Sequence, residues 1–367
     1  MIQGFAHARD SFDTPDHSEH PALPLSPFPR IVALGGGTGL PVVLRGLATA
    51  LRAAVGDDDA TRWADWLSAI VTVTDDGGSS GRLRNDLGML PPGDIRNCLA
   101  ALSSDAAFNR LLAHRFDGQT YLDGHPVGNL LIAALTQMTG SFSQAVEEMG
   151  TLLKACGRVH PATNEDVTLR AELANGESID GETAIVGHRS GIRRLALARH
   201  VPPETGALRA LINADVIVLG PGSLYTSILP NLLVDAVAST LSAVRGIRIV
   251  IGNLMTQPGE TDGATLDDHL RVLKEHTGHD LFDYVLLNRT PPTERQLARY
   301  RHEGAELLRH DDPLPSAGGA EIVLADLLDT ESDQVRHDSD KLAAAILEIA
   351  RRPLPFRGWP ATRPGVA

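Results

Sequence analysis

The feature that most constrains the fold is a repeated unit in which a short apolar strand runs directly into a glycine-rich turn. Residues 31–34 (IVAL) are followed by GGGTG, and residues 216–219 (VIVL) are followed by GPGS. A strand that is apolar at every position is expected where helices cover both faces of a parallel sheet. Glycine turns that lead into helices are typical of the carboxyl ends of such strands. The sequence therefore predicts an α/β fold built on a parallel sheet.

The alternation of strands and helices continues along the chain. Further strands are expected at 69–74, 247–251 and 284–287, and helices at 94–102 and 128–138. This order predicts a Rossmann-like, doubly wound, mostly parallel sheet. Between about 157 and 200, short alternating segments are separated by Asn-Gly and Asp-Gly pairs, which favour tight hairpins. A small β insertion is therefore expected there.

Composition and charge indicate the domain boundaries, the classes of partner and the location. Residues 30–354 are expected to form the α/β domain, and the polar segments 1–29 and 355–367 to be disordered tails. The N-terminal segment lacks the pattern of a signal peptide, and no apolar run is long enough to span a bilayer. A net charge of -13 argues against nucleic acid or anionic membrane as partners. Two widely spaced cysteines fit a reducing compartment, so a cytoplasmic protein is predicted.

The loop GGGTG is a candidate phosphate site. Gly36, Gly37 and Gly39 would let the backbone approach a phosphate closely, and Thr38 could add a hydroxyl donor. Leu40 stands where the dinucleotide fingerprint has its third glycine, and no Gly-Lys-Ser/Thr follows to make a P-loop. A tight strand-to-helix turn without a ligand is the alternative. The phosphate interpretation is favoured because the later loop, with Gly222 and Ser223, repeats the design.

The second expected strand ends in DDGGSSG, which contains the adjacent carboxylates Asp75 and Asp76 and also Ser79. Two neighbouring carboxylates repel each other unless a cation, a donor or a ligand hydroxyl compensates. One of them could cap the loop, and the other could hold a sugar hydroxyl, coordinate Mg²⁺ or act as a general base. An Asx turn with a solvated partner is the structural alternative.

Further polar residues that are candidates for ligand binding lie at two expected helix starts and in one long loop. Asp94 is expected as an N-cap, with Arg96 and Asn97 in the first turn, and an arginine there suggests a bound anion. His125 and Asn129 flank another helix start, where a ligand contact and a structural hydrogen bond are both open. The loop NLMTQPGETDG could read an uncharged sugar or base by hydrogen bonds. Its candidate residues are Asn253, Thr256 and Gln257.

Six segments in this order resemble the gluconeogenesis factor (YvcK-type) family, which belongs with the CofD-like proteins. They are GGGTGLPVVLRGL, VTVTDDGGSSGRLR, LPPGDIRNCLAAL, GHPVGNLLIAAL, LGPGSLYTSILPNLLV and NLMTQPGETDG. The resemblance covers about residues 30–289. On this resemblance Gly36 to Gly39 match the first phosphate loop, and Gly222 and Ser223 match the later glycine loop. Asp75 and Asp76 match the acidic pair shared with the relative 2-phospho-L-lactate transferase.

The resemblance implies a Rossmann-like fold, a cytoplasmic location and binding of a nucleotide sugar such as a UDP-sugar. It also implies a role in cell shape and wall synthesis during growth on gluconeogenic carbon, with homo-oligomers and wall-synthesis proteins as expected partners. The alternative is a Mg²⁺-dependent transferase that uses a nucleoside diphosphate-linked donor, with Asp75 and Asp76 as catalytic residues. A nicotinamide oxidoreductase is the least supported function, because the third glycine is missing.

Overall fold

The computed structural model describes residues 28–57, 60–188, 190–309 and 319–353. The expected tails therefore lie outside the described residues, apart from Phe28 and Pro29 at the end of the first one. Phe28 is only 3% exposed and belongs to the hydrophobic core, so the buried chain begins before Arg30.

The main sheet has seven parallel strands in the order β10-β9-β8-β7-β1-β2-β3. The strand order runs outward in both directions from β1 and β7, which is the doubly wound arrangement predicted from the sequence. The strands are β1 (Ile31–Gly35), β2 (Leu67–Val71), β3 (Arg158–Pro161), β7 (Val216–Leu219), β8 (Ile247–Ile251), β9 (Tyr284–Asn288) and β10 (Glu321–Ala325).

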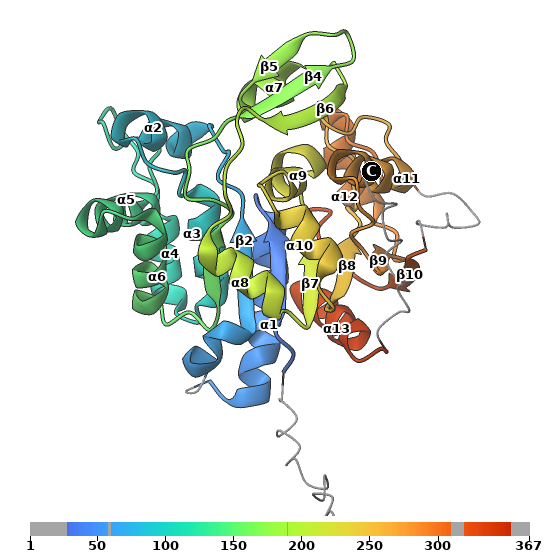
Figure 1. Cartoon of the computed structure of the whole chain (residues 1–367), viewed down its shortest axis with the longest axis horizontal. Coiled ribbons are helices and arrows are strands. Elements are labelled where there is room, and N and C mark those ends of the chain that lie inside the picture. Colours follow the sequence, from blue (N-terminus) through green and yellow to red (C-terminus); the bar gives the residue numbers. More distant parts are fainter. Residues whose placement is uncertain (1–27, 58–59, 189, 310–318, 354–367) are drawn as a thin grey trace, which may run out of the picture.

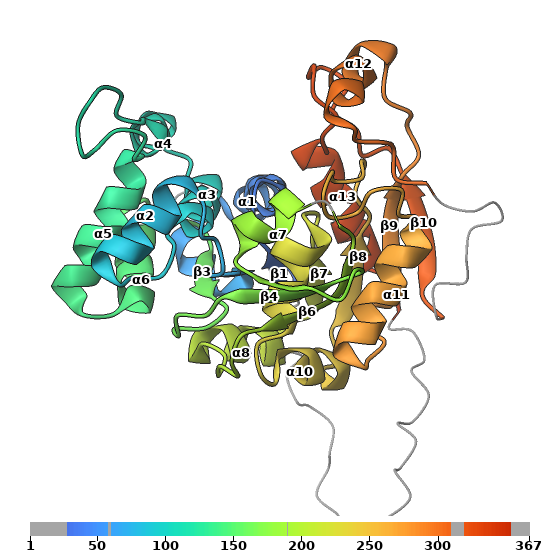
Figure 2. The ribbon, with the colours of Figure 1, turned by 90° about the horizontal axis from the view of Figure 1, so that it is seen from above.

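Helices cover both faces of this sheet (Figures 1 and 2). On β1, Ala33 packs into one hydrophobic core, whereas Val32 and Leu34 pack into the other. This division explains why the strands are apolar at consecutive positions. The first core is built with α1 (Gly39–Val55), α3 (Gly93–Leu102), α6 (Phe142–Leu152) and α13 (Ser339–Ala350). The second is built with α8 (Thr205–Asn213), α9 (Leu229–Leu232), α10 (Val237–Ala243) and α11 (Leu266–Thr277).

A second, three-stranded antiparallel sheet lies beyond the carboxyl edge of the main sheet, at the top of Figure 1. It contains β4 (Leu169–Leu173), β5 (Ser178–Asp180) and β6 (Ile192–Leu197), with α7 (Glu182–His188) between β5 and β6. The insertion is shorter than expected, because β3 at its predicted start pairs with β2 in the main sheet. The segment 182–188, expected to alternate as a strand, is helical.

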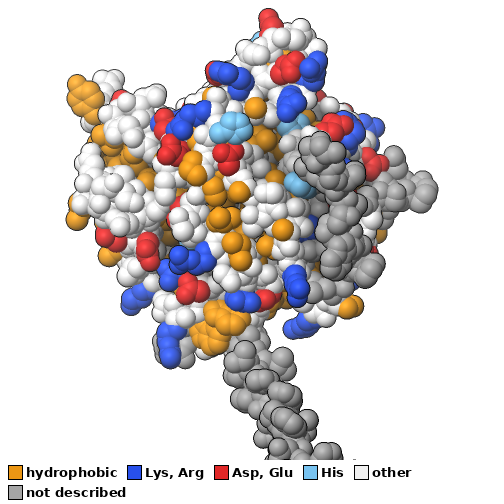
Figure 3. Space-filling model, in the orientation of Figure 1, with side chains coloured by type: hydrophobic (Ala, Val, Ile, Leu, Met, Phe, Trp, Pro, Cys, Tyr) orange, Lys and Arg blue, Asp and Glu red, His pale blue; other side chains and the backbone are white. Residues whose placement is uncertain are grey.

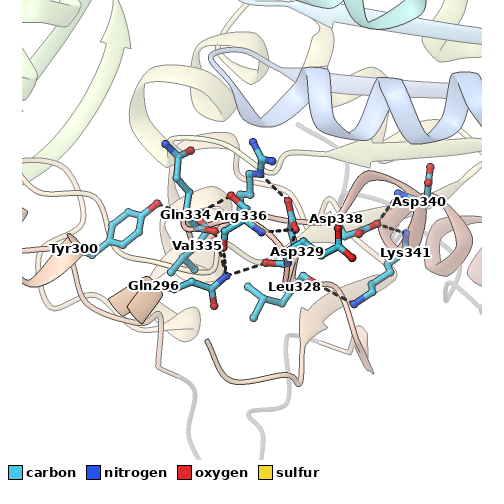
Figure 4. A network of polar contacts seen from close by, with 12 residues as sticks. Gln296, Tyr300, Leu328, Asp329, Gln334, Val335, Arg336, Asp338, Asp340 and Lys341 are labelled. Atoms are coloured by element: carbon cyan, nitrogen blue, oxygen red, sulfur yellow. Dashed lines mark hydrogen bonds and ion pairs between the residues drawn. The ribbon is translucent and has the colours of Figure 1, made fainter. Parts of the chain in front are cut away.

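The remaining helices are α2 (Gly78–Leu87), α4 (Ala106–Ala113), α5 (Val127–Thr139) and α12 (Glu294–Glu303). Polar contacts fasten α12 to the segment that leads into α13 (Figure 4). The Gln296 amide donates to the carbonyl oxygens of Asp329 and Ser332, each at 2.9 Å. Asp338 caps α13 by accepting the amides of residues 340 and 341. These contacts therefore fix the start of α13, and the rest of this helix packs on α1.

On the face drawn in Figure 3, acidic and basic side chains of the described residues are interspersed, and insertion residues such as Arg170 and Asp180 form ion pairs. In the described part of the chain, no single helix is long and apolar enough to cross a bilayer. One bent pair, Leu224–Leu232 with Val237–Ala243, has sufficient length and composition, but its apolar residues belong to the second core.

Candidate functional site

The loops after β1 and β7 meet where the strand order reverses. β1 lies between β2 and β7, so both loops leave the sheet at adjacent carboxyl ends. The chain turns into α1 through Gly36, Gly37 and Thr38, and a Cβ on Gly39 would overlap the carbonyl oxygen of Pro221. The absence of a side chain at position 39 thus lets the two loops touch. Ligands of open α/β sheets bind in the crevice at this switch point.

The first loop presents the start of α1. Thr38 is the N-cap of this helix, and its side chain makes no capping hydrogen bond. The helix begins at Gly39, so Pro41 lies in the first turn rather than at the first helical position. The first amides of a helix lack intrahelical acceptors and carry partial positive charge. Thr38 and Asn97 also line a groove of about 670 Å³ beside α1.

The second loop is held by side chains from the loop after β8. Asn253 spans the backbone of Gly222: its Oδ1 accepts the Gly222 amide at 3.2 Å, and its Nδ2 donates to the Gly222 carbonyl at 2.9 Å. Gln257 Nε2 donates to Ser223 Oγ at 2.5 Å. The structure therefore brings these four predicted residues together at the switch point.

Two other residues of the loop after β8 differ in their surroundings. Thr256 pairs with Glu306, since its amide donates to the Glu306 carbonyl at 2.7 Å and its hydroxyl accepts the Glu306 amide at 2.9 Å. Glu260, 9% exposed, accepts a hydrogen bond from Thr226 Oγ at 3.2 Å through Oε1. Its Oε2 is buried and has no hydrogen-bond partner among the described residues. Burial raises the pKa of Glu260.

Asp94 joins α3 to the first glycine loop. Its Oδ2 accepts the Gly37 amide at 2.6 Å. The expectation that Asp94 caps α3 was wrong: the N-cap is Pro92, and Asp94 lies in the first turn, from which its side chain reaches the neighbouring loop. Burial raises the pKa of Asp94 to about 6. This carboxyl group therefore couples the position of α3 to that of the first glycine loop.

Five predicted residues form a chain of hydrogen bonds beside this contact. Ser79 Oγ lies 2.8 Å from His125 Nδ1 and accepts from Asn129 Nδ2 at 3.0 Å. Arg96 donates to Asn129 Oδ1 at 2.9 Å and to Asn97 Oδ1 at 2.6 Å. Burial lowers the pKa of both His125 and Arg96. These bonds join the starts of α2, α3 and α5, and they give all five side chains a structural task.

The acidic pair lies beyond β2, which ends at Val71 and not at Thr74 as the sequence suggested. Asp75 Oδ1 accepts the Gly77 amide at 2.9 Å, which makes an Asx turn. Asp76 Oδ1 accepts the backbone amide of Thr183 at 2.9 Å and its hydroxyl at 2.6 Å. The two neighbouring carboxylates therefore serve different segments: Asp75 shapes its own loop, and Asp76 holds the insertion.

This arrangement bears on the Mg²⁺ expectation. A magnesium ion needs near-octahedral oxygen ligands, of which the protein supplies carboxylates on one side. Within the described ranges, no three His, Cys, Asp or Glu side chains converge in a geometry that could hold a metal ion. One oxygen of Asp75 and one of Asp76 are also engaged with different partners. The described residues thus form no preformed three-ligand cage, whereas a magnesium ion that arrives with phosphates needs only one or two carboxylates.

Glu182 is a residue of this site that was not singled out from the sequence. It is the first residue of α7, and Thr74 Oγ lies 3.5 Å from its Oε2. Burial, followed by the charge of Asp75, raises the pKa of Glu182 to about 9. The other charges that act on it are those of Asp94, Glu260 and Asp76. No local pattern marked this glutamate, because the fold of the insertion brings it to the sheet edge.

The comparisons agree with this architecture. Residues 31–328 match the family model described as 2-phospho-L-lactate transferase CofD. The chain is 40% identical over 325 residues to the gluconeogenesis factor of Bacillus subtilis, covering 88% of this chain and 98% of that protein. It is also 40% identical over 321 residues to the gluconeogenesis factor of Halalkalibacterium halodurans, covering 87% and 96%.

A solved structure extends the likeness to three dimensions. The crystal structure of a member of the UPF0052 family from Bacillus halodurans is 40% identical and superposes with a TM-score of 0.80. The superposition covers 86% of this chain and 99% of that one. The family expected from the glycine loops and their order is thereby confirmed. The chain belongs to the gluconeogenesis factor family, whose members share the CofD-like fold.

Proposed function

We propose that this protein binds a nucleotide sugar, with a UDP-sugar as the ligand, and acts in cell shape and wall synthesis during gluconeogenic growth. The observation that carries the proposal is the contact between the two glycine loops at the switch point, where Gly39 packs on Pro221. A diphosphate seated there would accept hydrogen bonds from the first amides of α1 and from the Thr38 hydroxyl. Gly222 and Ser223 belong to the loop that packs against the first one, since a Cβ on Gly39 would lie 3.2 Å from the Gly222 amide nitrogen.

Binding is tested by calorimetry of the full chain with UDP-N-acetylglucosamine and UDP-glucose. Thr38→Val keeps the shape of the side chain and removes the hydroxyl. We expect it to weaken binding about 10-fold or more, because a hydrogen bond to a charged group contributes about 1.5–3 kcal/mol. Thr151→Val, at an exposed position of α6 outside the groove beside α1, is the matched control and should leave the affinity unchanged. Absence of heat with the unaltered chain would overturn the proposal.

A transferase of the CofD type is the second candidate, and it is supported by the family match over residues 31–328. It would require Mg²⁺-dependent binding of a guanine nucleotide and transfer of a phosphorylated group. Thermal unfolding with UDP-sugars, GDP and GTP, each with and without Mg²⁺, separates the two candidates. Stabilisation by UDP-sugars without the metal supports the binding protein, and selective Mg²⁺-dependent stabilisation by guanine nucleotides supports the transferase.

The expected location and partners belong to the same proposal. Cys98 and Cys156 are buried free thiols, which is consistent with a cytoplasmic protein. A homo-oligomer and contacts with wall-synthesis proteins are proposed on the family likeness alone. Sedimentation of the purified chain with and without UDP-N-acetylglucosamine tests the first of these, since a monomer in both conditions contradicts it.

A further inference from the structure

The insertion connects the two halves of the site. Asp76, from the loop after β2, accepts two hydrogen bonds from Thr183 at the start of α7. On the other side, the loop after β8 approaches α7 so closely that a Cβ on Gly259 would overlap the carbonyl oxygen of Val186. These loops come from strands on opposite sides of the switch point. Helix α7 therefore joins the loops of the two halves, and it lies over β1 and β7 in the view of Figure 2.

The residue that α7 directs back toward the sheet is Glu182. Its carboxyl group contacts Thr74, which lies just beyond the end of β2. Glu260 approaches from the loop after β8, nine-tenths buried, with Oε2 unpartnered in the described part of the chain. A buried oxygen without a donor costs free energy, and a ligand that supplies the donor would recover it.

The chemistry of this region differs from that of the glycine loops. The loops offer amides and hydroxyls that suit phosphate, whereas the carboxyl groups of Asp75 and Glu260 lie near enough to Glu182 to raise its pKa, and the ionised ones would repel a phosphate. A carboxylate accepts hydrogen bonds from adjacent hydroxyls, and a carboxylic acid can also donate one. An uncharged, polyhydroxylated group therefore fits this region, and phosphate does not.

We propose that Glu182 is a specificity-determining residue that binds the hydroxyl groups of the sugar, so that the insertion distinguishes a nucleotide sugar from the bare nucleotide. The inference rests on the proposed function, because it requires a diphosphate at the two glycine loops. With the diphosphate in place, the attached sugar extends under α7. Glu182 contributes to the sugar's affinity and leaves that of the nucleoside diphosphate unchanged.

The test compares UDP with UDP-N-acetylglucosamine and UDP-glucose by calorimetry on the full chain. Glu182→Leu, which keeps the bulk of the side chain and removes both oxygens, should weaken binding of both UDP-sugars about 10-fold, which corresponds to about 1.4 kcal/mol, and leave UDP binding unchanged. Glu182→Asp, which retracts the carboxyl group by one methylene, should show the same selective loss. Glu172→Leu is the matched control: it makes the same chemical change in the same insertion, where Glu172 pairs with Arg193.

The outcomes separate the two proposals. Equal losses for UDP and the UDP-sugars would show that Glu182 only maintains the structure, and an unchanged sugar affinity in both variants would show that it has no part in binding. Either result overturns this inference while the proposed function stands. Absence of binding to the unaltered chain overturns the proposed function and this inference together.

Discussion

A buried histidine gives this protein a specific sensitivity to acid. His337 is 7% exposed, and its Nε2 has no hydrogen-bond partner among the described residues. Burial lowers the pKa of His337 to about 4. In the unfolded chain the pKa returns to about 6.5, so between these values the unfolded state binds a proton that the folded state does not. The contribution of His337 to the free energy of unfolding is therefore complete above pH 6.5, and it is lost as the pH falls toward 4.

We predict that His337→Gln reduces this acid sensitivity, because glutamine takes up no proton. The free energy of unfolding of the unaltered chain should fall by up to about 1.4 kcal/mol per pH unit below 6.5 through this residue. Chemical denaturation at pH 7 and pH 5 measures the difference, which should be smaller in the variant. The exposed His114→Gln serves as the control. An equal pH dependence in all three proteins would contradict the prediction.

At the scale of residues, the sequence predicted the positions of the glycine turns well and the tasks of the acidic residues poorly. A glycine indicates that two backbone segments approach closely, and this signal can be read from the glycine itself. Asp94 was expected to act within its own helix, yet its partner Gly37 lies 57 residues away. Asp76 likewise serves Thr183, 107 residues further along the chain. Such contacts exist only after the strands have assembled, so neither spacing nor side-chain type could indicate them.

Among the elements, α1 and α13 depend on a glycine within a helix. A Cβ on Gly46 of α1 would overlap the backbone carbonyl oxygen of Ser339 at the start of α13 and approach Ala343 Cβ to 2.9 Å. Backbone cannot move aside as a flexible side chain can. Position 46 therefore sets how closely the two helices pack.

We predict that Gly46→Ala lowers the free energy of unfolding by about 1–3 kcal/mol, the usual cost of overpacking a core. The same substitution at Gly150 of α6 is the matched control, since its nearest neighbour, Leu99 Cδ2, would lie 3.5 Å from the new Cβ. Gly150→Ala should stabilise by about 0.5–1 kcal/mol, because alanine favours the helix. Denaturant titration of both variants measures the contrast, and a stabilised Gly46→Ala chain would refute this account.

The elements that the sequence did not predict share a physical cause. Strands β1, β7, β8 and β9 were expected because burial on both faces makes them continuously apolar. β3 is a short edge strand with the sequence RVHP, so that signal is absent. In α7, the alternation SIDGETAIV favours a strand. The helix forms where Asp76 accepts the amide and the hydroxyl of Thr183 at its start, which is a tertiary effect that outweighs local pattern.

For the molecule as a whole, α13 completes the core although it lies beyond the family match at residues 31–328. Burial of Leu342, Ile346 and Ile349, each fully buried, contributes about 5–9 kcal/mol. A domain has only about 5–15 kcal/mol of stability in total. We predict that a chain ending at Asp338 does not fold cooperatively, whereas one ending at Pro353 does. Circular dichroism during heating distinguishes them, and a cooperative transition in the shorter chain would contradict the prediction.

The central position of β1 has a consequence for synthesis on the ribosome. One edge of β1 is covered by β2, which follows soon after, but the other edge awaits β7. Arg30 and Asp215, which pair at the entrance of these two strands, are 185 residues apart. At translation rates of about 5–20 residues per second, roughly 10–40 seconds separate the emergence of the two strands. During that interval the nascent chain carries an apolar, unpaired strand edge, the kind of surface that aggregates or recruits chaperones. The adjacency of β1 and β7, which brings the two glycine loops together, thus also leaves an exposed strand edge while the protein is being made.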